Sequence, residues 1–237
     1  MPLLEVRDLE TAYGVSQVLF GLALTVERGE LVALLGRNGA GKTTTLASIM
    51  GVVPPRRGSI RFKDREVLGL EPFLASQLGL GYVPENSRLF TNLTIAENFE
   101  AARLAPRAGN TAAPWTIERV VSLFPDLGTM LERRASACSG GQQRMVAIAR
   151  TLMGNPDLLL LDEPSEGLAP IVIDHLLRQL KTLKAAGATV LISEQNLRFA
   201  TELADRVYII EKGEIRFEGA PADLAAQSEL RQKYLMV

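Results

Sequence analysis

The stretch Gly36-Arg37-Asn38-Gly39-Ala40-Gly41-Lys42-Thr43-Thr44 decides the fold of this chain. It follows an apolar run at residues 31–35 and precedes residues 45–50, whose composition favours a helix. The residues that match the pattern G-x-x-x-x-G-K-[ST], in its required strand–loop–helix context, are Gly36, Gly41, Lys42 and Thr43. The structural alternative is a glycine turn before a surface lysine, which four matched positions with the right flanks disfavour. The sequence therefore predicts a phosphate-binding loop for a nucleoside triphosphate.

The residue types in this loop suit phosphate chemistry. Glycines let the backbone turn tightly and point its N–H groups inward at phosphate oxygens. A helix that starts near Lys42 adds the positive end of its dipole. The Lys42 ammonium can reach the β- and γ-phosphates, and the Thr43 hydroxyl can ligate the Mg²⁺ that accompanies the nucleotide. We expect these residues to contact the nucleotide: Gly36, Asn38, Gly39, Ala40, Gly41, Lys42, Thr43 and Thr44.

Composition narrows the class of protein. A length of 237 residues suits one or two domains with a sizeable core, and a net charge of -1 argues against bulk nucleic-acid binding. No apolar run approaches the roughly 18 residues of a membrane span, and the first residues lack a charged-then-apolar signal pattern. The single cysteine, Cys138, excludes an internal disulfide and fits the reducing cytosol. The single histidine, His175, leaves too few ligands for a structural zinc site.

Strand-like and helix-like stretches alternate along the chain, which indicates a parallel sheet covered by helices. The expected strands are residues 3–9, 17–26, 31–35, 59–63, 158–161 and 188–193, with a hairpin at 207–211 and 214–218. The expected helices outside the central segment are residues 74–80, ended by Gly81, then 171–186, 196–203 and 221 to the end.

The segment from about residue 84 to 149 has a different character and is predicted to be a helical insertion. Its expected helices are residues 95–104, 117–124 and 127–134, with a polar, Gly- and Pro-containing break at 106–114. Thr94 and Glu97 form the pattern of a capping box at the first of these helices. A longer helix is expected over residues 140–153.

Asp162 and Glu163 close the apolar run at residues 158–161. Such a strand delivers both carboxylates to the carboxyl edge of the sheet, where α/β proteins bind ligands. Asp162 can hold Mg²⁺, and Glu163 can polarise a water for in-line attack on a γ-phosphate. The structural alternative is a strand-ending turn with two solvated acids.

A third stretch, Cys138-Ser139-Gly140-Gly141-Gln142-Gln143-Arg144, opens the helix expected at 140–153. A hydroxyl and bare backbone N–H groups at a helix N-terminus can hold an anion. A Ser-Gly-Gly helix cap also occurs for purely structural reasons, so this stretch alone leaves both interpretations open.

Together and in this order, the three stretches resemble the ATP-binding cassette (ABC) family, from Leu4 to about Val237. The resemblance implies a P-loop NTPase core with a parallel sheet, an antiparallel β N-terminal subdomain and a helical insertion subdomain. A single ABC ATPase domain would span 1–237, with the core at 1–84 and 150–237 and the helical subdomain at 85–149. It also implies that Tyr13 stacks on the adenine of ATP. The matched signature residues, which would cap the ATP of a second cassette in a head-to-tail dimer, are Ser139, Gly140, Gly141 and Gln142.

Four positions depart from the family pattern. Cys138 replaces the usual leucine of the signature, and Ala169 replaces an aspartate. Glu85 stands where a glutamine is usual; it can approach Mg²⁺ or water but repels bare phosphate. Gln195 stands where a histidine contacts the γ-phosphate; it can donate one amide hydrogen bond but carries no charge. We expect Lys42, Glu163 and Gln195 as the catalytic set, and Thr43, Asp162 and Glu85 around the metal.

The departures resemble one subgroup, the ATPase subunits of branched-chain amino-acid importers. The runs that carry this resemblance are residues 83–85, 162–170, 193–196 and 233–237. It implies a cytoplasmic ATPase on the inner face of the membrane, paired with a sister ATPase subunit or a second copy of itself. It also implies two membrane permeases and an extracytoplasmic solute-binding protein. Importers of urea, short amides or aromatic acids share much of the pattern, and residues 86–88 lack the glycine common after position 85.

Other functions remain open at this point. A non-transport ABC protein acting on DNA or ribosomes usually carries a long coiled-coil insertion or two cassettes, which 237 residues do not fit. A regulatory module without ATP turnover is suggested by Glu85 and Gln195 but opposed by intact Asp162 and Glu163. A GTPase would need a guanine-reading Asn-Lys-x-Asp stretch, which is not evident in the sequence.

Overall fold

The structure is a computed structural model that describes residues 1–103 and 114–234. Its strands are β1 (Leu4–Tyr13), β2 (Ser16–Val26), β3 (Leu31–Leu35), β4 (Arg57–Phe62), β5 (Arg65–Glu66), β6 (Leu80–Val83), β7 (Leu158–Asp162), β8 (Val190–Glu194), β9 (Arg206–Glu211) and β10 (Glu214–Gly219). Its α-helices are α1 (Lys42–Ile49), α2 (Pro72–Leu78), α3 (Ile95–Ala102), α4 (Ile117–Leu123), α5 (Pro125–Gly128), α6 (Gly140–Met153), α7 (Pro170–Ala185), α8 (Leu197–Leu203), α9 (Pro221–Ala226) and α10 (Ser228–Tyr234).

The strands form two sheets. One is antiparallel with the order β2-β1-β4-β5, and the other has six strands in the order β10-β9-β3-β8-β7-β6. Within the larger sheet, β3 pairs in parallel with both β8 and β9, and β7 pairs in parallel with β6 and β8. Only its edge strand β10 runs antiparallel to its neighbour. The α/β fold with an antiparallel N-terminal subdomain is therefore confirmed.

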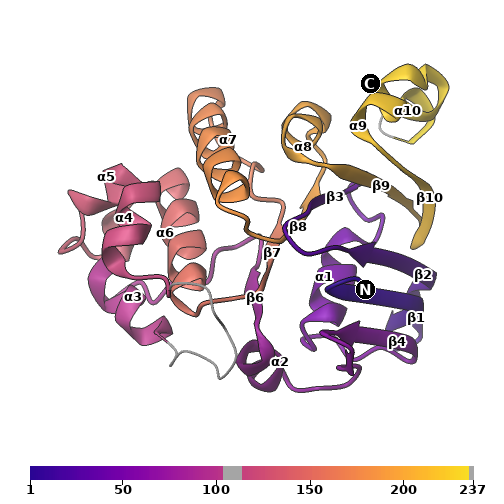
Figure 1. Cartoon of the computed structure of the whole chain (residues 1–237), viewed down its shortest axis with the longest axis horizontal. Helices are drawn as coiled ribbons and strands as arrows, with labels where there is room; N and C mark the ends of the chain where they lie inside the picture. The colour runs from indigo at the N-terminus through magenta and orange to yellow at the C-terminus, as the bar shows by residue number, and fades with distance from the viewer. Residues whose placement is uncertain (104–113, 235–237) are drawn as a thin grey trace.

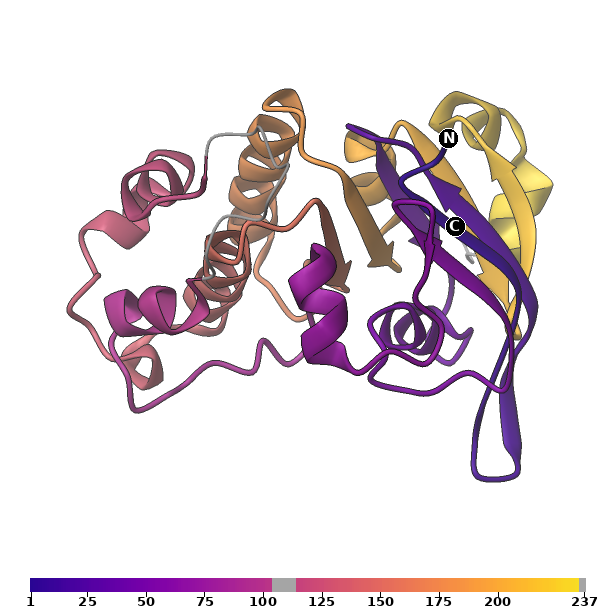
Figure 2. The same ribbon diagram turned by 60° about the horizontal axis from the view of Figure 1, so that its bottom comes forward.

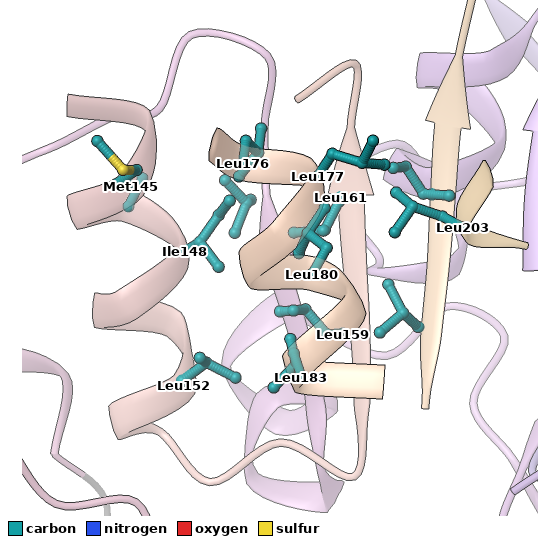
Figure 3. Close-up of a cluster of buried hydrophobic side chains, with 14 of the residues drawn as sticks. Met145, Ile148, Leu152, Leu159, Leu161, Leu176, Leu177, Leu180, Leu183 and Leu203 are labelled. Atoms are coloured by element: carbon teal, nitrogen blue, oxygen red, sulfur yellow. The ribbon is translucent and has the colours of Figure 1, made fainter. Parts of the chain in front are cut away.

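The larger sheet separates two hydrophobic cores, because neighbouring residues of a strand point to opposite faces. On one face, alternate residues such as Val32 and Leu34 pack with α1 and the antiparallel sheet. On the other, Ala33 and Leu35 pack with the helical segment and α7. Figure 1 shows the antiparallel sheet and helices α3 to α6 on opposite sides of the larger sheet. Figure 3 shows Leu159 and Leu161 of β7 in one hydrophobic cluster with side chains of α6 and α7.

Four parallel strands end at the same edge of the sheet, and the residues at or just after their ends include several of the predicted site residues. Gly36 follows β3, and Glu85 lies two residues after β6. Asp162 and Glu194 are the last residues of β7 and β8. The parallel register pairs Leu35 with Glu194 and Asp162 with Ser193, so these ends lie level with one another.

The predicted helix at residues 74–80 is wrong in its bounds. The helix α2 spans Pro72–Leu78, and Gly79 ends it with a φ of 120°. Leu80 and Gly81, which the prediction placed at the end of the helix, are paired in β6 with Leu158 and Leu159 of β7. The nearby Gly79 takes the left-handed backbone that ends a helix, so Gly81 is free to be a strand residue.

The predicted helix at residues 127–134 is also wrong. The short α5 ends at Gly128, and the chain that follows runs beside the start of α3. The amide of Ala96 donates to the carbonyl of Leu131, and the amide of Ile95 donates to that of Arg133. These bonds satisfy two of the free N–H groups at the start of α3. This tertiary pairing replaces the helix that the local sequence pattern predicted for residues 127–134. The predicted break at 106–114 falls almost wholly outside the described residues.

Other expectations agree closely with the structure. The long helix begins at Gly140 and ends at Met153 as predicted, and Thr94 and Glu97 form both bonds of a capping box. Because α6 continues through residues 149 and 150, the proposed subdomain boundary there coincides with no break in the helix. Within residues 1–103 and 114–234, the helices are all too short or too polar to cross a membrane.

Candidate nucleotide-binding site

The backbone of the phosphate loop explains each of its three glycines. Gly39 and Gly41 have φ angles of 78° and 113°, a region that favours glycine. A Cβ on Gly36 would lie 2.6 Å from the carbonyl oxygen of Ile210. Gly41 is the N-cap of α1, so the N-terminus of this helix faces the loop. The loop is thus held in one conformation at a helix N-terminus, which suits phosphate oxygens.

Lys42 lies inside the loop and is only 3 % exposed. Its ammonium donates to the carbonyls of Gly36 at 2.7 Å and Arg37 at 2.9 Å. It also forms an ion pair with the Glu163 carboxylate at 3.0 Å. The predicted catalytic pair Lys42 and Glu163 is therefore in direct contact in this structure.

Asp162 is the centre of a buried hydrogen-bond network. Its Oδ1 accepts from the hydroxyls of Thr43 at 3.1 Å and Ser193 at 2.6 Å, and its Oδ2 accepts from Tyr82 at 3.2 Å. Burial raises the pKa of Asp162, while these three hydrogen bonds oppose the rise. Burial and the charge of Asp162 also raise the pKa of Tyr82.

The pair Thr43 and Asp162 offers the oxygen ligands that Mg²⁺ prefers. Mg²⁺ is usually held by one or two protein side chains together with phosphates and water, so this donor set fits the predicted ion. Glu85, also predicted near the metal, is exposed, and no hydrogen bond in the described part of the chain joins it to Thr43 or Asp162. No cluster of three His, Cys, Asp or Glu side chains suited to a metal occurs among the described residues.

Glu163 has a strained backbone, with a φ of 45°. A non-glycine residue in this region costs about 1–3 kcal/mol and persists when its surroundings fix it. Its N–H donates to the carbonyl and the hydroxyl of Ser193, each at 3.1 Å. The conformation turns the chain sharply after β7, and the carboxylate lies against Lys42.

Glu194 is a buried carboxyl that sequence reasoning did not select as a site residue. It is 1 % exposed and contacts Ser165 and Asn196. Burial raises its pKa to about 7. Tyr82 was likewise missed. The sequence signal for Glu194 was its place between the strand predicted at 188–193 and the selected Gln195. Tyr82 had no such signal, because it follows residues that were predicted as a helix and lies in no predicted strand.

The remaining nucleotide-side residues are exposed. Tyr13 ends β1 and is 51 % exposed, on a hairpin that extends away from the rest of the antiparallel sheet (Figure 2). Gln195 is exposed directly after β8. Both are available to a ligand, and their predicted contacts with adenine and phosphate stay predictions. His175 lies on α7, where its ring contacts Gln179 at 3.0 Å, so it cannot take the place of Gln195.

The signature stretch forms a capping box at the start of α6. The Ser139 hydroxyl accepts from the backbone N–H of Gln142 at 3.3 Å, and the side-chain oxygen of Gln142 accepts from the backbone N–H of Ser139 at 2.9 Å. Ser139 and Gly140 are exposed. Among the described residues, no hydrogen bond or ion pair joins this stretch to the phosphate loop. A single chain therefore does not bring these two predicted anion sites together.

Comparisons with known proteins agree with this geometry. Residues 19–166 match the family described as ABC transporter. The chain is 39 % identical to the high-affinity branched-chain amino acid transport ATP-binding protein BraG of Pseudomonas aeruginosa, over 98 % of this chain and 99 % of that protein. It is 32 % identical to the lipopolysaccharide export system ATP-binding protein LptB of Escherichia coli K12, over 99 % and 98 %. A crystal structure of the ADP conformation of MJ1267, an ATP-binding cassette of an ABC transporter, superimposes with a TM-score of 0.84 at 25 % identity, over 100 % and 98 %.

Proposed function

Since this chain belongs to the ABC transporter family and is an ATPase subunit of a transporter, we propose that it powers an importer of branched-chain amino acids. The observation that carries this proposal is the identity with BraG, which extends over nearly the full length of both chains. The runs at residues 83–85, 162–170 and 193–196, which include the unusual Glu85 and Gln195, support the same subgroup.

In the proposed site, backbone N–H groups of the phosphate loop and the Lys42 ammonium hold the phosphates of ATP. The phosphates would compete with the Glu163 carboxylate, which contacts the same ammonium at 3.0 Å. ATP binding thereby releases Glu163 from its ion pair. A freed carboxylate can then accept a proton from the attacking water.

Thr43 and Asp162 are proposed to hold Mg²⁺, directly or through water. When bound, the ion would supply positive charge that stabilises the phosphate oxygens. Gln195, which follows β8, is proposed to donate an amide hydrogen bond to the γ-phosphate. Tyr13 is proposed to stack on the adenine, since an exposed ring on a projecting hairpin is free to do so.

ABC cassettes act as dimers, and here a second chain would supply the missing anion site. The exposed Ser139 and Gly140 are proposed to lie against ATP held by the phosphate loop of the partner. The partner is a sister ATPase subunit or a second copy of this chain. We further propose that the pair sits on the cytoplasmic side of the membrane, on two permease subunits, and that an extracytoplasmic binding protein delivers the solute.

The similarity to LptB favours a second candidate, an export ATPase. The two functions share the same ATP chemistry and differ in the direction and nature of the cargo. The identity is 32 % with LptB against 39 % with BraG, so import is the first choice. Importers of urea, short amides or aromatic acids remain alternatives for the solute.

The test is uptake of labelled leucine by cells in which the native chain is replaced by Glu163→Gln. We expect loss of uptake, because the substitution removes the carboxylate that accepts a proton. Glu202→Gln, which alters an ion pair between α7 and α8, is the matched control and keeps uptake. If leucine uptake is retained but urea or aromatic-acid uptake is lost, the solute of the importer is urea or an aromatic acid and not leucine. Retained uptake of all these solutes favours export or a role outside transport.

A further inference from the structure

The side chain of Glu194 is almost completely buried at the end of β8, although no cation pairs with it in the described part of the chain. Burying an unpaired carboxylate is unfavourable unless hydrogen bonds satisfy its oxygens. Three donors do so here. Oε1 accepts from the Ser165 N–H at 3.0 Å, and Oε2 accepts from the Ser165 hydroxyl at 2.8 Å and the Asn196 N–H at 3.2 Å.

These contacts connect two loops that carry proposed catalytic residues. Ser165 lies two residues after Glu163, in the turn that follows β7. Asn196 follows Gln195 directly and caps α8 by accepting from the Phe199 N–H at 3.1 Å. The Glu194 carboxylate therefore holds the backbone just after Glu163 and just after Gln195.

The main chain of Glu194 adds a third loop. Its carbonyl accepts from the N–H of Gly36, the first residue of the phosphate loop, at 3.2 Å. The phosphate loop, the turn after Glu163 and the loop of Gln195 thus all bond to one residue. The strained backbone of Glu163, with its φ of 45°, needs such restraint to persist.

We propose that Glu194 is a positioning residue for ATP hydrolysis, whose carboxylate holds the loops of Glu163 and Gln195 in fixed register with the phosphate loop. The inference rests on the proposed roles of Glu163 and Gln195. Glu194 itself does not contact the reacting atoms. Its effect is on the geometry of attack, where a displacement of about 1 Å can lower the rate by about 10²-fold.

A glutamine cannot reproduce this arrangement. Two of the three donors are backbone N–H groups, which cannot reverse their roles, whereas the Ser165 hydroxyl can accept. The amide of glutamine offers one oxygen and one NH₂ group. In either orientation its NH₂ group faces one backbone N–H, of Ser165 or of Asn196. Glu194→Gln therefore breaks one of the two backbone hydrogen bonds and sets an NH₂ group against that N–H, with almost no change in side-chain volume.

The experiment measures ATP hydrolysis by the full chain, purified with the subunits that accompany it. Glu194→Gln is expected to lower kcat about tenfold and to leave the KM for ATP within about twofold. Ser165→Ala removes one of the same contacts, so the double variant is expected to be no slower than Glu194→Gln alone. Glu163→Gln serves as the reference for the catalytic role.

The matched control is Glu30→Gln. Glu30 is also mostly buried, and its side chain accepts from Arg206 at 2.8 Å and from the Glu27 N–H at 2.8 Å. It precedes β3, at the end of the sheet opposite to the phosphate loop. Its substitution is expected to lower the melting temperature and to leave kcat unchanged. A merely structural role of Glu194 would give the same result as this control.

The outcomes separate the two proposals. If Glu163→Gln abolishes hydrolysis while Glu194→Gln keeps kcat within twofold, the positioning role is overturned and the proposed function stands. If Glu163→Gln still hydrolyses ATP normally, the proposed catalytic role fails first. Should Glu194→Gln not fold, Ser165→Ala carries the test, and an unchanged kcat of that variant overturns the inference.

Discussion

The phosphate loop and the signature stretch, residues 138–144, both contain glycines, but contacts within the chain explain the need for glycine more fully in the first than in the second. In the phosphate loop, neighbouring atoms or backbone angles explain Gly36, Gly39 and Gly41. In the signature stretch, a Cβ on Gly141 would lie 2.7 Å from Val172, but one on Gly140 would meet no atom within 4 Å. One half of the proposed site is therefore fixed inside the chain, whereas the other half contains Gly140, a glycine that no contact among the described residues requires.

The same contrast holds for charge. Lys42 is buried against Glu163, with side-chain exposures of 3 % and 8 %. Among the described residues, the Ser139 and Gln142 side chains bond only to their own helix end and to Met130. Substitutions in the first region should therefore change the free energy of unfolding of the isolated chain, and those at Gly140 should not.

Lys42→Met is expected to lower the free energy of unfolding by about 3–5 kcal/mol, because it leaves the Glu163 carboxylate buried without its cation. Urea unfolding of the isolated chain measures this change. Hydrolysis is expected to fall by at least about 10²-fold, since a group that stabilises charge in the transition state is lost. The double variant Lys42→Met/Glu163→Gln should regain most of the stability but no activity. If Lys42→Met alone were as stable as the native chain, the buried ion pair between Lys42 and Glu163 would not contribute to stability.

Because Glu194 is buried, we expect the free energy of unfolding to depend on pH. Burial raises its pKa from 4.5 to about 7 in the folded chain, so its contribution is fully present below pH 4.5 and is lost as the pH rises through 7. One pKa unit corresponds to about 1.4 kcal/mol, which gives about 3 kcal/mol in total. The charged groups that act on it are Glu163, which favours the neutral form, and Arg144, which favours the ionised form.

Urea unfolding at pH values between 5 and 8 measures this contribution. Glu194→Gln has no proton to exchange, so its stability should fall less than that of the native chain over this range. Glu30→Gln keeps Glu194 and should show the native slope. Parallel curves for the native chain and Glu194→Gln would show that Glu194 titrates at its ordinary pKa.

The sequence could predict the phosphate-loop region because its signals are local. A strand, a glycine loop and a helix cap all follow from residues a few positions apart, and the bounds of α6 were predicted for the same reason. Residues 127–134 could not be predicted, because their structure is decided by bonds to the start of α3. Glu194 was missed because its three contacts come from two loops, and only the pairing of β7 with β8 brings these together.

Gly141→Ala should sharpen the comparison inside the signature stretch. A methyl group at this position would lie 2.7 Å from the Val172 side chain, so α6 and α7 must move apart slightly. Overpacking of this kind costs about 1–3 kcal/mol. Thermal unfolding of the isolated chain checks the loss. The further substitution Val172→Ala, which removes the opposing methyl groups, should restore part of it, and an unchanged melting temperature of Gly141→Ala would contradict this packing.

Gly140→Ala should have the smallest effect on the isolated chain. A methyl group there meets no atom within 4 Å, so we expect a change below about 0.5 kcal/mol in the free energy of unfolding and unaltered ATP binding. In the dimer proposed above, the same methyl group would lie against the ATP held by the phosphate loop of the partner. Hydrolysis by the complex is then expected to fall, by about tenfold or more. If the complex hydrolyses ATP at the native rate, Gly140 faces solvent in the assembly as well, and the second half of the site must be built from other residues.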